Sequence, residues 1–204
     1  MWRHVPPDNK IRVERRATVE KWKSIYASGR QPGGSPASPI IEEFLLKNAR
    51  SGMRILDAGC GTGRSSRYLS AKLLQAGIEM DYICIDALPL LSQHSKMEMM
   101  IADAFFLPFK GNTFDFVYMR HLMDEYSLAS RLAIAAEMHR LLREEGALLI
   151  EMRANEFITD IQNFCSAIEN SGMFSVTLIN FRRCAGSSWK SSRYSVDIIA
   201  LKSM

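Results

Sequence analysis

The chain shows two spacings of hydrophobic residues, one typical of buried strands and the other typical of helices. Short apolar runs alternate with longer segments in which apolar residues recur every three or four positions. The apolar runs predict strands at residues 53–57, 81–85, 97–102, 114–119 and 147–152. The periodic segments predict helices at residues 64–76, 129–144 and 155–170. Strands that alternate with helices indicate a parallel sheet with crossover helices.

The end of the chain departs from this alternation. Two β-rich runs, residues 173–181 and 193–201, follow each other without a helical pattern between them. Such an ending is typical of an antiparallel hairpin added to a parallel sheet. Gly77, Gly146 and Gly172 follow the predicted helices and are expected to end them, because glycine readily adopts the left-handed conformation of a helix C-terminus.

The segment before the first predicted strand has its own pattern. Residues 10–27 have helical spacing, with an apolar side formed by Val19, Trp22, Ile25 and Tyr26. Residues 29–39 form a loop rich in glycine and proline, and Ser38 is placed to cap the helix that follows. We expect residues 1–36 to supply a helix and a flap over a ligand site, and residues 37–204 to form the main domain of a single-domain protein.

The composition is that of an ordinary globular domain. The 204 residues are 47% hydrophobic and 24% charged, which fits one α/β domain. No apolar run approaches the roughly 20 residues of a membrane span, and no secretory signal opens the chain, so we expect a cytoplasmic protein without a membrane partner. No metal site is predicted, because metal-ligand spacing is absent from the cysteines, which are Cys60, Cys84, Cys165 and Cys184.

The charge is mildly positive and unevenly distributed. The formal net charge is +4, and basic residues gather within residues 1–30 and 181–204. Two basic ends could attract an anionic substrate or RNA. A solvated surface is the simpler interpretation, so a nucleic-acid partner is left open but not favoured.

The most informative segment lies where the first predicted strand ends. Residues 55–63 read Ile-Leu-Asp-Ala-Gly-Cys-Gly-Thr-Gly, so that Gly59, Gly61 and Gly63 separate a strand from a helix. Glycines in such a turn let the backbone approach a ligand closely, and the helix N-terminus adds a positive dipole end. These features predict a nucleotide-like ligand. Asp57 would repel a pyrophosphate but suits a ligand that carries an ammonium group.

This segment resembles motif I (Asp/Glu-x-Gly-x-Gly-x-Gly) of the class I methyltransferases that depend on S-adenosyl-L-methionine (SAM). Residues 103–109 and 114–117 are also similar to segments of that family, and the resemblance covers roughly residues 37–201. Within that family, the chain is similar to the broad small-molecule group, called methyltransferase type 11 or ubiquinone-biosynthesis-like. It implies SAM as cofactor. The implied fold is α/β, a Rossmann-like three-layer sandwich whose seven-stranded, mostly parallel sheet has the order 3-2-1-4-5-7-6 and a C-terminal antiparallel hairpin.

The resemblance also implies roles for residues at the strand ends. Asp86 would accept the ribose hydroxyls, and Ala87 would pack against adenine. Asp103 would accept the adenine amino group, and the backbone N–H of Ala104 would meet the ring. The backbone carbonyl of Tyr118 would face the methionine part of SAM. The two aspartates can also be interpreted as turn or cap residues.

The acceptor side is less clearly marked. The Asn-Pro-Pro-Tyr sequence of amino methyltransferases is absent from residues 118–125, which read Tyr-Met-Arg-His-Leu-Met-Asp-Glu. His121 stands where several small-molecule enzymes of the group place a polar residue. It is the candidate catalytic residue, because histidine accepts a proton near neutral pH, although a plain loop role is the alternative. Acceptor recognition is expected from residues 1–39, 120–128 and 181–193.

Methyl transfer to a small-molecule acceptor is therefore the preferred function, and other functions stay open. An RNA or protein methyltransferase would use the basic ends, with tryptophans nearby for stacking. A non-catalytic SAM-binding protein would keep the same cofactor motif. A nicotinamide-cofactor enzyme would share the glycines and the acid at Asp86, but it would require neither Asp57 nor Asp103.

Overall fold

The computed structural model describes residues 9–29, 37–89, 97–154, 158–183 and 194–203. Most of the expected flap and the expected acceptor loop at 184–193 therefore lie outside the described residues. Within the described ranges, no helix is long and apolar enough to cross a membrane.

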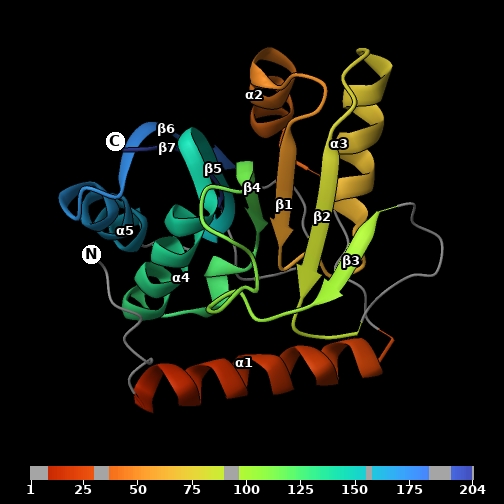
Figure 1. Ribbon diagram of the computed structural model, residues 1–204. Helices are drawn as coiled ribbons and strands as arrows, with labels where there is room; N and C mark the ends of the chain where they lie inside the picture. The colour runs from red at the N-terminus through yellow and green to blue at the C-terminus, as the bar shows by residue number, and fades with distance from the viewer. Residues whose placement is uncertain (1–8, 30–36, 90–96, 155–157, 184–193, 204) are drawn as a thin grey trace.

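One seven-stranded sheet forms the centre of the described part of the chain, in the order β3-β2-β1-β4-β5-β7-β6 (Figure 1). Neighbouring strands from β3 to β5 run parallel, and β7 pairs antiparallel with both β5 and β6. The predicted fold and strand order are thus confirmed. The strands are β1 Arg54–Ala58, β2 Asp81–Asp86, β3 Glu98–Ile101, β4 Phe114–Arg120, β5 Leu142–Ala154, β6 Phe174–Arg183 and β7 Tyr194–Lys202.

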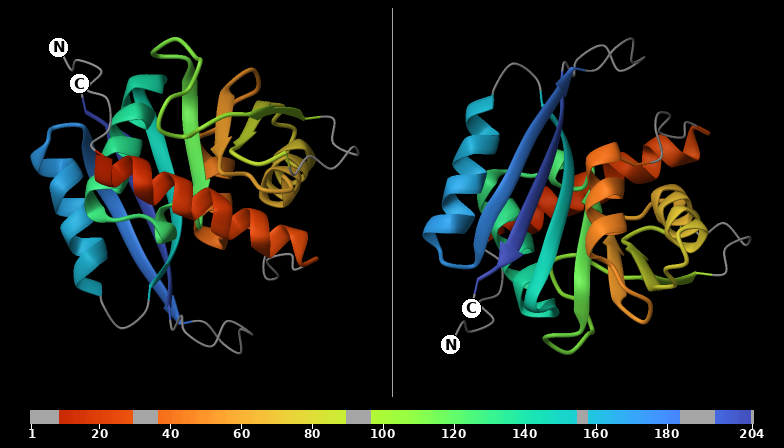
Figure 2. Two further views of the ribbon diagram at one scale, coloured as in Figure 1. Left: turned by 90° about the horizontal axis from the view of Figure 1, so that it is seen from below. Right: turned by 90° about the horizontal axis from the view of Figure 1, so that it is seen from above.

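Helices cover both faces of this sheet (Figure 2). The helices are α1 Asn9–Ala27, α2 Pro39–Asn48, α3 Arg64–Gln75, the 3-10 helix η1 Met123–Glu125, α4 Leu128–Leu141 and α5 Ile158–Asn170. Ser38 caps α2 as predicted, because its side chain accepts the N–H of Ile40 at 3.1 Å.

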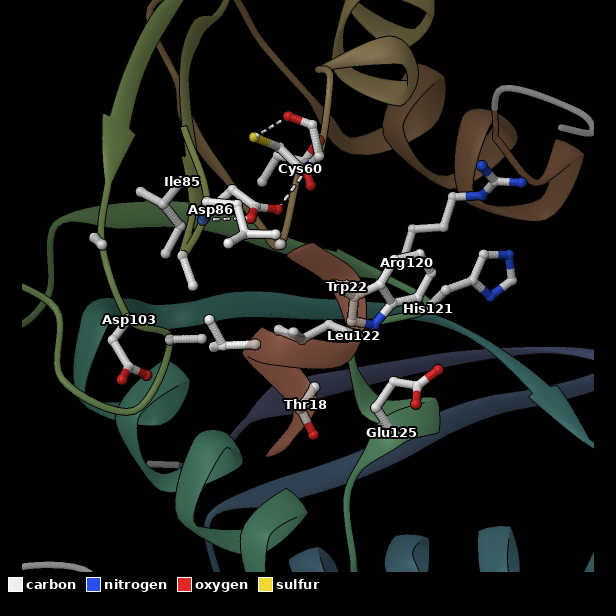
Figure 3. A pocket seen from close by; sticks show the side chains of 18 of the residues that line it. Thr18, Trp22, Cys60, Ile85, Asp86, Asp103, Arg120, His121, Leu122 and Glu125 are labelled. Carbon is white, nitrogen blue, oxygen red and sulfur yellow. Dashed lines mark hydrogen bonds between the residues drawn. The ribbon is translucent and has the colours of Figure 1, made fainter. Parts of the chain in front are cut away.

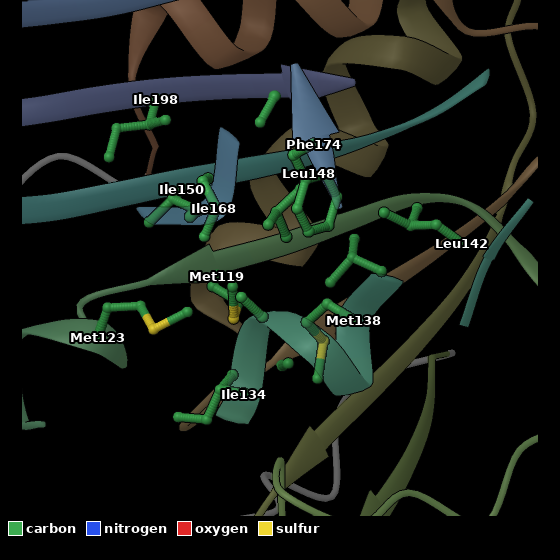
Figure 4. Close-up of a cluster of buried hydrophobic side chains, with 14 of the residues drawn as sticks. Met119, Met123, Ile134, Met138, Leu142, Leu148, Ile150, Ile168, Phe174 and Ile198 are labelled. Atoms are coloured by element: carbon green, nitrogen blue, oxygen red, sulfur yellow. The ribbon is translucent and has the colours of Figure 1, made fainter. Parts of the chain in front are cut away.

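Two hydrophobic cores follow from the alternation of side chains along the strands. Leu56, Val117 and Leu148 face the core under α4 and α5 (Figure 4). Their chain neighbours Ile55, Phe116 and Leu149 face the core under α2 and α3. Successive residues of a strand point to opposite faces, so an unbroken apolar run fills both cores and produces the three-layer sandwich.

The predicted end of the helix before the fifth strand is wrong. The helix was expected at 129–144 with Gly146 as its stop, but α4 ends at Leu141 and Leu142 is already extended. The pairing of β4 with β5 then skips between Phe114/Leu142 and Phe116/Ala147. The residues between these two pairs form an irregularity in β5. It arises from the pairing of β5 with β4, and the helical spacing of apolar residues in the sequence did not predict it.

Gly146 has a packing role in this irregularity. A Cβ there would lie 2.9 Å from the carbonyl oxygen of Arg143 and 3.1 Å from that of Asp115. Both obstacles are backbone atoms, one in β5 itself and one in β4, so a side chain could enter only if the backbone of β5 shifted relative to both.

We therefore expect Gly146→Ala to lower the free energy of unfolding by about 1–3 kcal/mol, the usual cost of overpacking. Urea denaturation measures the change. Glu144→Ala, at an exposed position two residues away, is the control and should change stability by about 0.5 kcal/mol or less. Equal stability of Gly146→Ala and the control would contradict the packing role.

Candidate functional site

The glycine loop after β1 is anchored to the end of β2. The N–H groups of Gly59 and Cys60 both donate to the carbonyl oxygen of Ile85 at 2.9 Å. The N–H of Gly61 donates to Asp86 Oδ2 at 2.8 Å. Gly61 has a φ of 56°, and a Cβ at this position would lie 2.9 Å from the Tyr26 hydroxyl of α1. The positive φ favours glycine here, and a side chain would also displace the end of Tyr26.

A pocket opens at the carboxyl ends of β1 to β4, beside this loop (Figure 3). It is lined by most of the predicted site residues, namely Asp57, Gly59, Gly61, Asp86, Ala87, Asp103, Ala104 and His121. Gly63 and Tyr118 are not among its lining residues. Gly63 precedes α3 with a φ of 71°, and Tyr118 is buried with its hydroxyl donating to Glu151 Oε1 at 2.5 Å.

Asp57 is a buried carboxyl group at the end of β1. Its side chain accepts a hydrogen bond from the Ser66 hydroxyl at the start of α3. Burial raises the pKa of Asp57 to about 7, although the Ser66 hydrogen bond opposes the shift, and the neighbouring carboxylate of Asp86 raises the pKa further. A cationic ligand group in the pocket would favour the charged form of Asp57. The residue therefore fits the ammonium group of SAM.

Asp86 both holds the glycine loop in place and lines the pocket. Its two oxygens accept the N–H groups of Gly61 at 2.8 Å and Leu88 at 2.9 Å. Burial raises the pKa of Asp86, and these hydrogen bonds offset the shift only in part. A third backbone hydrogen bond comes from Ala87. A carboxylate has about four lone-pair sites, so Asp86 keeps acceptor capacity for about one ligand hydroxyl.

Asp103 contacts both its own turn and helix α1. Its Oδ1 accepts the N–H of Phe105 at 3.0 Å, which is the cap-like contact expected as the alternative. Its Oδ2 pairs with the guanidinium of Arg15 from α1. Asp103 is therefore shared between its own turn and the helix that crosses the site.

His121 lies on the other side of the pocket, directly after β4. It has a φ of 60°, which is unusual for a residue with a side chain, and its N–H donates to the carbonyl oxygen of Glu151 at 2.8 Å. Its Nδ1 lies 3.1 Å from Asp124 Oδ2. Burial opposes ionisation of Asp124, but hydrogen bonds from His121 and Arg153 outweigh it and lower the pKa of Asp124. The imidazole is thus oriented by a carboxylate that stays charged.

Two buried acids that the sequence pattern did not indicate, Asp124 and Glu151, hold the residues around His121 in place. Glu151 accepts the Ser38 N–H at 2.7 Å and Arg120 Nε at 3.2 Å, in addition to Tyr118. Asp124 accepts both the N–H and Nε of Arg153 at 2.9 Å. Asp124 is three residues from His121, a spacing that could have indicated the pair; no comparable signal marks Glu151.

Helix α1 crosses the carboxyl ends of the strands (Figure 2, left) and lines one side of the pocket. Its pocket-lining residues lie on one side of the helix and are Arg15, Thr18, Val19, Trp22 and Tyr26. No described residue of α1 is fully buried. Most of its inner face lies over the pocket, and Ile11 packs against the edge of the core. Polar contacts hold the helix, since Glu14 accepts the N–H of Ser127 at 2.6 Å and Lys21 pairs with Glu125. The predicted helix and its apolar side are confirmed.

Metal binding has no visible basis in the described ranges, where no three His, Cys, Asp or Glu side chains gather as a metal site. Cys60, Cys84 and Cys165 are free thiols. A hydrogen bond with Cys84 and burial raise the pKa of Cys60, which makes the thiol in the glycine loop a poor nucleophile.

Comparison with known proteins agrees with this geometry. A family described as a methyltransferase domain matches residues 56–150. Human probable tRNA methyltransferase 9B is 30% identical over 123 residues, which are 60% of this chain and 26% of that protein. An uncharacterized protein of Methanocaldococcus jannaschii is 28% identical over 112 residues, or 54% of this chain and 41% of that protein. The chain therefore spans less than half the length of these relatives.

Solved structures show the same fold. A SAM-dependent methyltransferase from Methanosarcina mazei has a TM-score of 0.60 at 18% identity, covering 82% of this chain and 99% of that one. One from Aquifex aeolicus has a TM-score of 0.60 at 20% identity, covering 79% and 89%. The matched methyltransferase domain at residues 56–150 and the strand order β3-β2-β1-β4-β5-β7-β6 agree in placing the chain's similarity with the class I SAM-dependent methyltransferases.

Proposed function

We propose that this chain transfers a methyl group from SAM to a small-molecule acceptor. One observation carries the proposal: the carboxylates at three strand ends, Asp57, Asp86 and Asp103, line the same pocket as the glycine loop and His121. A buried acid suits the ammonium group of SAM, an acid with spare acceptor sites suits the ribose, and a third suits the adenine amino group. When bound, SAM supplies a methyl group on a positively charged sulfur, ready for in-line displacement.

The chain's own contribution is mainly positioning. The glycine loop places backbone N–H groups close to the ligand, and α1 covers the carboxyl ends of the strands and limits the entry of water. On the acceptor side, Asp124 holds the Nδ1 edge of His121, which leaves Nε2 as the nitrogen that can accept a proton from a nucleophile. Trp22 and Leu122 add apolar walls near this histidine (Figure 3).

A small acceptor is favoured because α1 lies over the pocket and is tied to the domain at several points along its length. Its contacts with Asp103, Glu125 and Ser127 span both sides of the site. A long polymer would need an open groove in this place.

RNA methylation is the second candidate. The outer side of α1 exposes basic residues, among them Arg12, Arg16 and Lys23, beside the pocket mouth. The human relative carries the name tRNA methyltransferase, although the match covers 26% of it. Basic residues at a site entrance attract phosphates, so this function deserves a direct test.

The cofactor assignment predicts that Asp86→Asn weakens binding of S-adenosylhomocysteine. Loss of the charge-assisted hydrogen bonds should cost about 1.5–3 kcal/mol, or roughly 10- to 100-fold in affinity by calorimetry. Asp81→Asn, at the opposite and exposed end of β2, is the control and should bind normally. Unchanged affinity in a folded Asp86→Asn protein would remove the ribose role.

The raised pKa of Asp57 predicts that its charged form lowers the stability of the ligand-free protein but is needed for cofactor binding. Because the pKa of Asp57 is raised from 3.8 to about 7, the ligand-free protein should lose stability as pH rises from about 4 to 7. Asp57→Asn should remove this loss and be more stable at pH 8 by on the order of 3 kcal/mol, yet bind S-adenosylhomocysteine poorly. Urea denaturation across this pH range, with Asp81→Asn as control, measures the first effect. A wild-type pH dependence in Asp57→Asn would contradict the assignment.

The acceptor class is tested by following labelled methyl groups. With methyl-labelled SAM and a cell extract separated into metabolites, protein and RNA, we expect label in the metabolite fraction. His121→Gln should lower labelling about 10²-fold or more if the imidazole accepts a proton. His139→Gln is the control, because His139 packs against Phe174 far from the pocket lining. Label in RNA would favour the second candidate, and no label despite cofactor binding would favour a non-catalytic SAM-binding protein.

A further inference from the structure

Arg15 of α1 occupies a defined place beside Asp103. Its Nη2 pairs with Asp103 Oδ2. Its guanidinium carbon lies 4.9 Å from the ring centroid of Phe105 and 5.2 Å from that of Phe106. The side chain is 23% exposed and lines the pocket. The ion pair and the two aromatic rings therefore fix the plane of the guanidinium.

One donor of this guanidinium lacks a partner. Among the described side chains, the buried polar atoms without a hydrogen bond are Arg15 Nε and the Tyr82 hydroxyl. Tyr82 belongs to the core under α2 and α3, whereas Arg15 lines the pocket. Buried donors are nearly always satisfied. Arg15 Nε is buried in the ligand-free structure, but its residue lines the pocket, so a turn of the guanidinium would bring this N–H to an acceptor atom on a ligand.

Donor and acceptor groups are thus adjacent at this end of the pocket. Asp103 offers carboxylate oxygens that accept, and Arg15 offers an N–H that donates. Adenine presents the complementary pair on one edge, an amino group that donates next to a ring nitrogen that accepts. A base with an oxygen in place of the amino group would face the Asp103 carboxylate with a second acceptor and would be rejected.

We propose that Arg15 is a recognition residue for the adenine of the cofactor, with Nε donating to a ring nitrogen while Nη2 stays on Asp103. This inference rests on the proposed cofactor site. It gives α1 a specific task beyond covering the pocket, because the helix then carries one half of the adenine contact and the end of β3 carries the other. Docking of α1 and recognition of the base become one event.

The test uses the full chain and calorimetry with S-adenosylhomocysteine. Arg15→Gln should bind about tenfold more weakly or worse, and Arg15→Lys should be similarly weak, because lysine keeps the charge but has no N–H at the Nε position. Lys21→Met is the control: it removes a second ion pair of α1, with the pocket-lining Glu125, at a residue that does not itself line the pocket. It should bind nearly as tightly as the wild type.

Analogues with C–H in place of N1 or N7 of adenine identify the contact. The wild type should lose about tenfold in affinity for one analogue, and Arg15→Gln should bind that analogue as well as it binds S-adenosylhomocysteine. Wild-type affinity in Arg15→Lys would overturn the inference, as would equal weakening by Lys21→Met or an analogue penalty that persists in Arg15→Gln. A wild type that binds no S-adenosylhomocysteine would instead overturn the proposed function.

Discussion

The anchoring of the glycine loop to the end of β2 is the constraint on which the site depends. Two N–H groups share the carbonyl oxygen of Ile85, and a third meets the carboxylate of Asp86. These bonds turn the chain sharply away from β1 and start α3 beside the pocket. The same carboxylate reaches Leu88 on its other side. One aspartate thus joins two loops that parallel strands bring to the same edge.

This arrangement removes several acidic side chains from water, which is unfavourable for their charged forms. Asp57, Asp86, Asp124 and Glu151 all lie at or near the carboxyl ends of neighbouring strands, and burial opposes the ionisation of the three aspartates. On the acceptor side, arginines and backbone N–H groups compensate Asp124 and Glu151. On the cofactor side, burial prevails and raises the pKa of Asp57. The uneven compensation separates the paired acids near His121 from Asp57, whose charged form a cationic ligand would favour under the proposed function.

Helix α1 relates to the domain differently from the other helices. The helices α2 to α5 bury apolar residues against the sheet, whereas α1 buries none of its described residues fully and is held by ion pairs and hydrogen bonds. Ionic contacts at a partly exposed surface are individually weak. Helix α1 is therefore joined to the domain mainly by polar contacts, and its inner face forms a wall of the pocket.

The sequence by itself determined the sheet order through the family resemblance, the two-sided burial of the strands, and the cluster of Asp57, Asp86 and Asp103. These features are local patterns repeated along the chain, and parallel topology then brings strand ends together. The tertiary structure alone decided the end of α4, the contacts of Glu151 with Ser38 and Tyr118, and the pairing of Arg15 with Asp103. Each of these depends on contacts between segments that pack together only in the folded chain, where periodicity carries no information about side-chain partners.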